Sequence, residues 1–333
     1  MLVKMKKYAM GLAGVLAVAA TGLAQTTPAP NAPVPAPAAR AAANPFPAVD
    51  PKNFTADSPT KDEVDAFLKA LWGYDENREW EVAGIVKTTA PGVSKVVVLV
   101  ADKRQPGKQM QSVFFTTPDG KHAIADGVMD FGAKPFAEDR KILQERADGP
   151  SRGAKSNDLM LVEFADLHCA QCQAAQEKME NLVQDFPQAK IVFEDVPQAG
   201  HPYSMQAALD GYCVRKTKGD AAFFSYVQAV YAKQAGLTAQ SADATLKAAI
   251  TAANADPTAV TACAATPEAK AAVTAATKLA SDVGVGQTPA LAVNGHLLLV
   301  DLIPYETLKQ MIAFQARQDG IPVHLQPTLS TLK

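Results

Sequence analysis

Cysteine is scarce in this chain of 333 residues, which contains four. A scaffold held together mainly by disulfides is therefore excluded, because such chains are dense in cysteine. Opposite charges almost cancel, with a formal net charge of -2, and the only basic cluster lies in the first seven residues. Nucleic-acid binding thus has no electrostatic support. The chain also contains no internal repeat.

Two of the four cysteines, Cys169 and Cys172, are separated by Ala170 and Gln171. They follow an apolar run, 159–164, which predicts a buried strand. A thiol at the start of the next helix becomes acidic, since unpaired backbone N–H groups and the helix dipole favour the thiolate. We therefore predict that Cys169 is an exposed nucleophile with a lowered pKa. Cys172, one helical turn further and more buried, is predicted to be the resolving thiol.

The same cysteine pair is also compatible with half of a zinc site or with a permanent disulfide. A structural zinc site needs a second pair of ligands. The chain has no second Cys-x-x-Cys and no pair of histidines at ligand spacing. We therefore predict a redox pair and expect neither a metal nor a cofactor.

The first 24 residues have the pattern of a secretory signal, with lysines before an apolar stretch and small residues up to Ala24. An uncleaved anchor is the alternative, although the apolar stretch is short for a membrane span. No cysteine lies near the predicted cleavage site, so lipid attachment is not indicated. We expect export to the periplasm or cell envelope, where disulfides persist.

The composition predicts how the remaining chain is divided. Residues 25–50 are almost entirely Pro, Ala, Thr and Asn, which predicts an extended, disordered linker. The remaining chain of about 280 residues is long enough for two domains. We predict an α+β module over 51–148, a catalytic domain over 154–317 and a loose tail over 318–333.

The first predicted domain is a small antiparallel sheet with one helix. Apolar residues have helical spacing over 61–71, after residues that cap helices well. Pro-Gly and Asp-Gly pairs mark turns between strand-like stretches. These stretches cover 79–87, 95–101, 110–116 and 121–129. A charged stretch over 138–145 predicts a connecting helix, and the glycines within 149–153 predict the boundary.

The second predicted domain has the order strand, helix, strand, helical block, hairpin and helix. Its elements are a strand over 159–164, a helix to about 184, a strand over 190–194, helices over 205–280, a hairpin at Asn294-Gly295 and a helix over 304–316. This order, with Cys-x-x-Cys at the first helix, resembles the thioredoxin superfamily. The helical insertion is similar to that of DsbA-type members. The resemblance implies an α/β, thioredoxin-like fold over 154–317, preceded by the α+β antiparallel-sheet domain.

The resemblance implies a role for Glu163. In thioredoxin-like proteins a buried acidic residue lies six positions before the first cysteine, and Glu163 has this offset from Cys169. It would carry a proton to or from Cys172, and burial would raise its pKa. A solvent-facing Glu163 at the strand edge is the alternative.

The resemblance also assigns Thr288 and Pro289 to substrate binding. Thioredoxin-like folds carry a cis-proline at this point, facing the cysteine pair, and Pro289 matches it. Its backbone would pair with an extended substrate segment. An ordinary trans proline in a loop is the alternative.

The residues next to the thiols are expected to contact substrate and tune the potential. His168 as an imidazolium would stabilise a thiolate, and an exposed residue without such a role is the alternative. Ala170 and Gln171 stand where oxidising and isomerising relatives commonly have Pro-His or Gly-His. The direction of electron flow therefore stays open.

Cys213 and Cys263 lie in the predicted helical block. As a pair they would close a loop of about fifty residues, which stabilises a fold by about 4 kcal/mol in the chain-entropy model. Some DsbA-like proteins carry a second disulfide in this insertion, so we predict a structural bond. A relay that passes electrons to Cys169 is the alternative.

The antiparallel module looks like the N-terminal domain of the DsbC and DsbG isomerases, which dimerises and shapes a peptide-binding cleft. A homodimer is therefore a possibility for this chain. Together these resemblances imply an exported thiol–disulfide oxidoreductase that acts on cysteine-containing exported proteins, as a disulfide donor or an isomerase. Its membrane redox partner would be DsbB-like, vitamin K epoxide reductase-like or DsbD-like. The alternative is a redox-inactive or weakly active chaperone that binds peptides in the thioredoxin-like groove.

Overall fold

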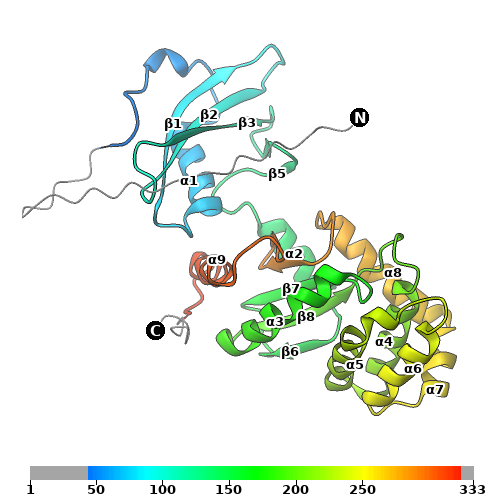
Figure 1. Cartoon of the computed structure of the whole chain (residues 1–333). Coiled ribbons are helices and arrows are strands. Elements are labelled where there is room, and N and C mark those ends of the chain that lie inside the picture. Colours follow the sequence, from blue (N-terminus) through cyan, green and yellow to red (C-terminus); the bar gives the residue numbers. More distant parts are fainter. Residues whose placement is uncertain (1–43, 324–333) are drawn as a thin grey trace, which may run out of the picture. The chain divides into compact units, whose positions relative to one another are not determined.

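The computed structural model describes residues 44–323, which form two five-stranded sheets with their own helices (Figure 1). The predicted signal over 1–24 lies outside the described residues. So do most of the linker predicted over 25–50 and most of the tail predicted over 318–333. Within the described residues, no helix is long and apolar enough to cross a membrane.

The first sheet is antiparallel, with its strands in the order of the sequence. Helix α1 covers one face, and its side chains pack with Val96, Val98 and Phe114 of the sheet. Thr60 begins this helix with a capping box that it shares with Glu63. The elements are the 3-10 turn η1 (Pro51–Asn53), α1 (Lys61–Trp72), β1 (Arg78–Lys87), β2 (Ser94–Asp102), β3 (Gln109–Thr116), β4 (His122–Ile124) and β5 (Val128–Asp130).

The fourth strand of this sheet departs from the prediction. A single strand over 121–129 was wrong, because the chain turns between β4 and β5 and pairs the two with each other. The turn is closed by a hydrogen bond from the Ala125 N–H to the Gly127 carbonyl at 2.9 Å.

The second sheet has the strand order β10-β9-β7-β8-β6. Its central strand β7 (Met160–Ala165) is buried along its whole length and runs parallel to β8 (Lys190–Asp195). The hairpin of β9 (Ala290–Val293) and β10 (His296–Leu299) continues the sheet on the other side. These four strands agree with the predicted ones.

The strand β6 (Ser151–Gly153) was not predicted. It pairs antiparallel with β8 at the sheet edge, within the stretch that was assigned to a domain boundary. Three residues are too few to show the alternation by which strands are recognised. The domain division stays a prediction, and the pairing of β6 favours a boundary placed earlier in the chain.

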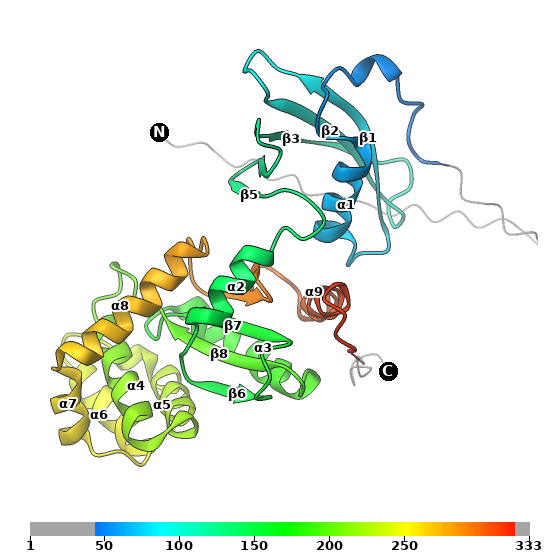
Figure 2. The same cartoon turned by 180° about the vertical axis from the view of Figure 1, so that it is seen from behind.

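Helices cover both faces of the second sheet (Figures 1 and 2). On one face, α3 (Ala170–Asp185) and α9 (Tyr305–Gln318) pack against alternate strand residues such as Leu161 and Ile191. On the other face, α2 (Ala137–Arg146) and α8 (Pro267–Asp282) pack against Val162 and Val192. This alternation places Glu163 on the α3 face, since it lies two residues after Leu161.

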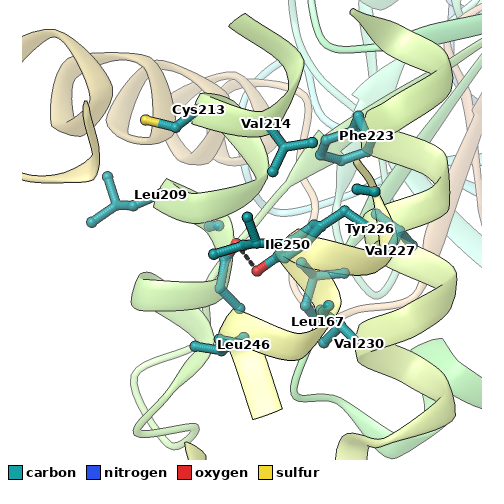
Figure 3. Packing of buried hydrophobic residues seen from close by; sticks show 14 of the residues in the cluster. Leu167, Leu209, Cys213, Val214, Phe223, Tyr226, Val227, Val230, Leu246 and Ile250 are labelled. Carbon is teal, nitrogen blue, oxygen red and sulfur yellow. Dashed lines mark hydrogen bonds between the residues drawn. The ribbon is translucent and has the colours of Figure 1, made fainter. Parts of the chain in front are cut away.

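The predicted helical block consists of α4 (Ser204–Lys218), α5 (Asp220–Ala232), α6 (Ala242–Ala252), α7 (Pro257–Ala264) and α8, with the 3-10 turn η2 (Gln234–Gly236) after α5. Its core surrounds Tyr226, whose hydroxyl donates to the Ala207 carbonyl at 2.9 Å (Figure 3). The same apolar cluster includes Cys169 and Cys172, so the helical insertion and the cysteine pair share one core.

Candidate active site

The cysteine pair lies where β7 passes into α3, with Cys169 as the N-cap of that helix. The prediction of an exposed Cys169 was wrong, because only 4% of this residue is accessible. Its thiol is enclosed by residues on both sides: Sγ lies 3.4 Å from Oε1 of Gln171 and 3.7 Å from the carbonyl oxygen of Thr288. Cys172 is fully buried, as expected for the inner thiol.

The two thiols differ strongly in acidity. A hydrogen bond from the Cys172 thiol lowers the pKa of Cys169, and backbone N–H groups of Cys172 and Gln171 lower it further. The same thiol–thiol bond and burial raise the pKa of Cys172 well above its usual value. At neutral pH, the outer sulfur therefore ionises while the inner one keeps its proton.

Glu163 lies on the strand beneath these thiols and is 1% exposed, which excludes the solvent-facing alternative. Burial raises the pKa of its carboxyl group from 4.5 to about 7. Oε1 accepts a hydrogen bond of 2.9 Å from Nε2 of Gln176, and the same nitrogen lies 3.4 Å from the Cys172 carbonyl. Glu163 is thus tied to the helix that carries the cysteines, and near neutral pH it can take up or release a proton.

The peptide bond between Thr288 and Pro289 is cis. Pro289 is buried and Thr288 partly exposed, immediately before β9. The contact between the Thr288 carbonyl and Cys169 joins residues 119 positions apart in the chain. The structure therefore brings Thr288 and Pro289 to the cysteine pair.

His168, Ala170 and Gln171 also border the thiols. Ala170 and Gln171 are exposed, and His168 is partly exposed with an inaccessible Nδ1 that has no hydrogen-bond partner within the described residues. Burial and the nearby His201 lower the pKa of His168. The hypothesis that an imidazolium at His168 stabilises the thiolate is therefore disfavoured, because the ring stays neutral at neutral pH.

Asp166 is a site residue that the sequence did not reveal. Its carboxylate is fully buried and accepts hydrogen bonds from the backbone N–H of His168 at 2.7 Å and of Gln198 at 2.9 Å. Nδ1 of His201 lies 2.7 Å from its Oδ2. The Asp166 N–H in turn points at Sγ of Cys172, 3.4 Å away. Asp166 thus links the loop after β8 to the start of α3.

The helical insertion also holds the loop before Cys169. Nε2 of Gln234 donates to the carbonyls of Leu167 and Cys169, both at 3.0 Å, and the Tyr231 hydroxyl donates to the Asp166 carbonyl at 3.4 Å. These contacts join residues that are 65 or more positions apart, so no local sequence pattern predicts them. The sequence gives only one indication of them, which is the presence of Gln and Tyr within an apolar helical block.

Cys213 and Cys263 form a disulfide that joins α4 to α7, as the sequence predicted. Within residues 44–323, no group of three or more His, Cys, Asp or Glu side chains has an arrangement that could hold a metal ion.

The family model described as thioredoxin matches residues 145–313, half of the chain. The chain therefore belongs to the thioredoxin family, and the second sheet with its helices is a thioredoxin-like fold with a helical insertion. No curated protein matches it.

Several solved structures resemble about half of the chain. ScsC of Proteus mirabilis in a transitional conformation is 21% identical, with 54% of this chain and 81% of that chain covered and a TM-score of 0.45. The thiol-disulfide exchange protein α-DsbA2 of Wolbachia pipientis is 18% identical, with 53% and 94% covered and a TM-score of 0.45. Oxidised BdbD of Bacillus subtilis is 20% identical, with 51% and 93% covered and a TM-score of 0.46.

Proposed function

We propose that this protein is a thiol–disulfide oxidoreductase that exchanges disulfides with cysteine-containing protein substrates through Cys169 and Cys172. The observation that carries the proposal is that the pKa values of the two thiols at the start of α3 are shifted in opposite directions. Cys169 has a lowered pKa and Cys172 a raised one. Cys169 is therefore available as an attacking thiolate, whereas Cys172 stays protonated until the mixed disulfide has formed.

The exchange reaction follows from this pair. The Cys169 thiolate attacks a substrate disulfide, forms a mixed disulfide and releases the second substrate sulfur as a thiolate. Cys172 gives its proton to ionised Glu163 and attacks Cys169 Sγ. The bond between Cys169 and the substrate breaks and the substrate sulfur leaves as a thiolate, so that the pair is oxidised and the substrate reduced. In the reverse direction the protein donates its disulfide. Thr288 and Pro289 would hold the extended substrate backbone beside Cys169.

Whether the protein is a disulfide donor or an isomerase depends on which direction of the exchange reaction dominates. A disulfide donor would be reoxidised by a membrane partner that is DsbB-like or vitamin K epoxide reductase-like, whereas a DsbD-like partner would keep an isomerase reduced. Ala170, Gln171 and His168 border the reactive sulfur and would set this balance. The reduction potential of the Cys169–Cys172 couple, measured against glutathione, separates a strong oxidant from a reductant or isomerase.

Substrates and location form part of the same proposal. Export to the periplasm or cell envelope fits the signal-like first residues and the Cys213–Cys263 disulfide, because such bonds persist outside the cytosol. A homodimer through the first sheet would bring two cysteine pairs to one cleft and favour isomerisation. Sedimentation of the mature protein tests the dimer.

The burial of Cys169 favours a second candidate function, a chaperone that binds peptides beside a weakly active pair. Cys169→Ala separates the two. We expect this variant to lose insulin reduction and RNase reoxidation, while Cys172→Ala accumulates a mixed disulfide with substrate. Gln228→Ala, an exposed change on α5, serves as the control. Full redox activity in Cys169→Ala would refute the enzyme proposal, and retained protection of unfolded clients would support the chaperone.

A further inference from the structure

Asp195, the last residue of β8, has a buried carboxyl group that the reaction described so far does not use. Both of its carboxyl oxygens are inaccessible and have no hydrogen-bond partner among residues 44–323. An ionised carboxylate in such a position costs several kcal/mol, so a group of this kind is held in its neutral form. Burial accordingly raises the pKa of Asp195 well above its usual value.

The register of the sheet places Asp195 beside the redox site. On the parallel strands β7 and β8, Glu163 stands opposite Phe193 and Ala165 opposite Asp195. Alternate residues face the same side of a sheet, so Glu163 and Asp195 both face the layer that contains α3. Their carboxyl groups interact electrostatically, and Asp195 interacts with Asp166 in the same way. The two acids thus belong to one buried group.

Asp195 also lines a cavity of about 450 Å³ together with Phe193, Ala208 and Phe223. The lining also includes Lys216, whose side chain is 45% exposed, so the cavity reaches the protein surface. A space of this size with polar groups in its wall admits water. Asp195 therefore interacts with the buried acid of the dithiol site and also lines a solvent-accessible cavity.

We propose that Asp195 is a second proton-holding carboxyl group of the dithiol site, which passes protons between Glu163 and the water of this cavity. The inference rests on the proposed function. When a substrate thiolate attacks Cys169 of the oxidised pair, the bond between Cys169 and Cys172 breaks and its electron pair goes to Cys172. Protonated Glu163 gives its proton to that sulfur, Asp195 reprotonates Glu163, and water in the cavity reprotonates Asp195.

The surrounding charges are consistent with this role. Besides burial, the acidic neighbours Asp166, Glu194 and Glu163 raise the pKa of Asp195, and the hydroxyls of Tyr226 and Tyr231 also interact with it electrostatically. Besides Asp195, the ionisable residues of the cavity wall are Arg146, Asp148, Glu194, Arg215, Lys216 and Asp220. Each of its three cations forms its own salt bridge, to Asp282, Asp220 and Glu268 respectively, and none bonds to Asp195.

Asp195→Asn tests the relay while keeping size and neutrality. The measurement is the rate at which dithiothreitol reduces the Cys169–Cys172 disulfide, in H₂O and in D₂O. We expect a loss of at least about tenfold and a larger solvent isotope effect, since a positioned proton transfer contributes on the order of 100-fold or more. The pKa of Cys169, measured by alkylation, should stay unchanged. The matched control is Asp210→Asn, a buried acid of α4 held by Gln206. An unchanged rate, or an equal loss in the control, overturns the proposal.

Infrared difference spectra of the reduced and oxidised protein give a second test that does not depend on the folding of Asp195→Asn. In Glu163→Gln, a carboxylic acid band that changes with the redox state should remain and be assigned to Asp195. Absence of any such band overturns the relay even where the wild type exchanges disulfides normally. A wild-type pair that cannot be reduced or reoxidised refutes the proposed function as well, which distinguishes the two failures.

Discussion

Gln176 connects the buried Glu163 to α3, the helix that carries the cysteine pair, since its Nε2 donates to Oε1 of Glu163 at 2.9 Å. It lies one turn after Cys172 on α3 and approaches the Cys172 carbonyl with the same nitrogen. Within residues 44–323, the charge of Arg152 and this neutral donor offset only part of the cost of ionising the buried carboxyl group. The position of the acid and its raised pKa have the same structural cause.

Glu163→Gln should change the pH dependence of stability. The pKa of Glu163 rises from 4.5 to about 7 on folding, so the folded protein binds more protons than the unfolded chain between these values. The contribution of Glu163 to stability is therefore lost as pH rises through this window. Relative to wild type, the variant should gain about 3 kcal/mol of unfolding free energy between about pH 4 and about pH 8. Urea unfolding of both proteins measures this difference, and a constant difference across the range would contradict it.

Alkylation of Cys169 with iodoacetamide should be half-maximal below pH 8.5, the approximate pKa of a free thiol. The reason is the hydrogen bond from Cys172 together with the backbone N–H groups of the helix start. His168→Ala should leave this midpoint unchanged, because the His168 ring is neutral and supplies no charge. A midpoint at or above that of a free thiol would show that the site does not stabilise the thiolate. A marked rise in His168→Ala would restore the imidazolium hypothesis.

Replacement of both Cys213 and Cys263 by Ser should lower the unfolding free energy by about 4 kcal/mol, as expected for a closed loop of this length. The two cysteines are 50 residues apart in the chain. Exchange activity at Cys169 should persist in the folded fraction if the bond is structural. If a folded double variant loses exchange with its redox partner, the relay alternative is favoured instead.

Gln234→Ala should destabilise the protein by about 1–3 kcal/mol, since it leaves the buried Leu167 carbonyl without its donor. The Cys169 carbonyl, also 3.0 Å from Nε2, would keep its bond from the Gln173 N–H at 3.1 Å. Thermal and urea unfolding measure the effect, with the exposed Gln228→Ala as its control. Equal stability of the two variants would show that the loop before Cys169 does not depend on this anchor.

Local patterns predicted most of the elements that position the site. Apolar runs marked β7 and β8, and the Asn294-Gly295 pair marked the hairpin because both residues adopt a positive φ, 46° and 94°. The helix start at Cys169 also followed from the order of strand and cysteines. The short strands were not predicted correctly, because β4, β5 and β6 contain only three residues each.

Residue type and spacing along the chain were enough to predict the cysteine pair as a candidate site, the strand and helix that present it, and the second disulfide. Contacts between distant segments were needed to show that Thr288 lies against Cys169, that Asp166 contacts His201, and that Asp195 interacts with Glu163 and lines a cavity. These contacts join residues about 30 to 120 positions apart. The physical reason is burial: the acidity of a carboxyl or thiol group depends on which distant segments exclude water from it, and no local pattern records that.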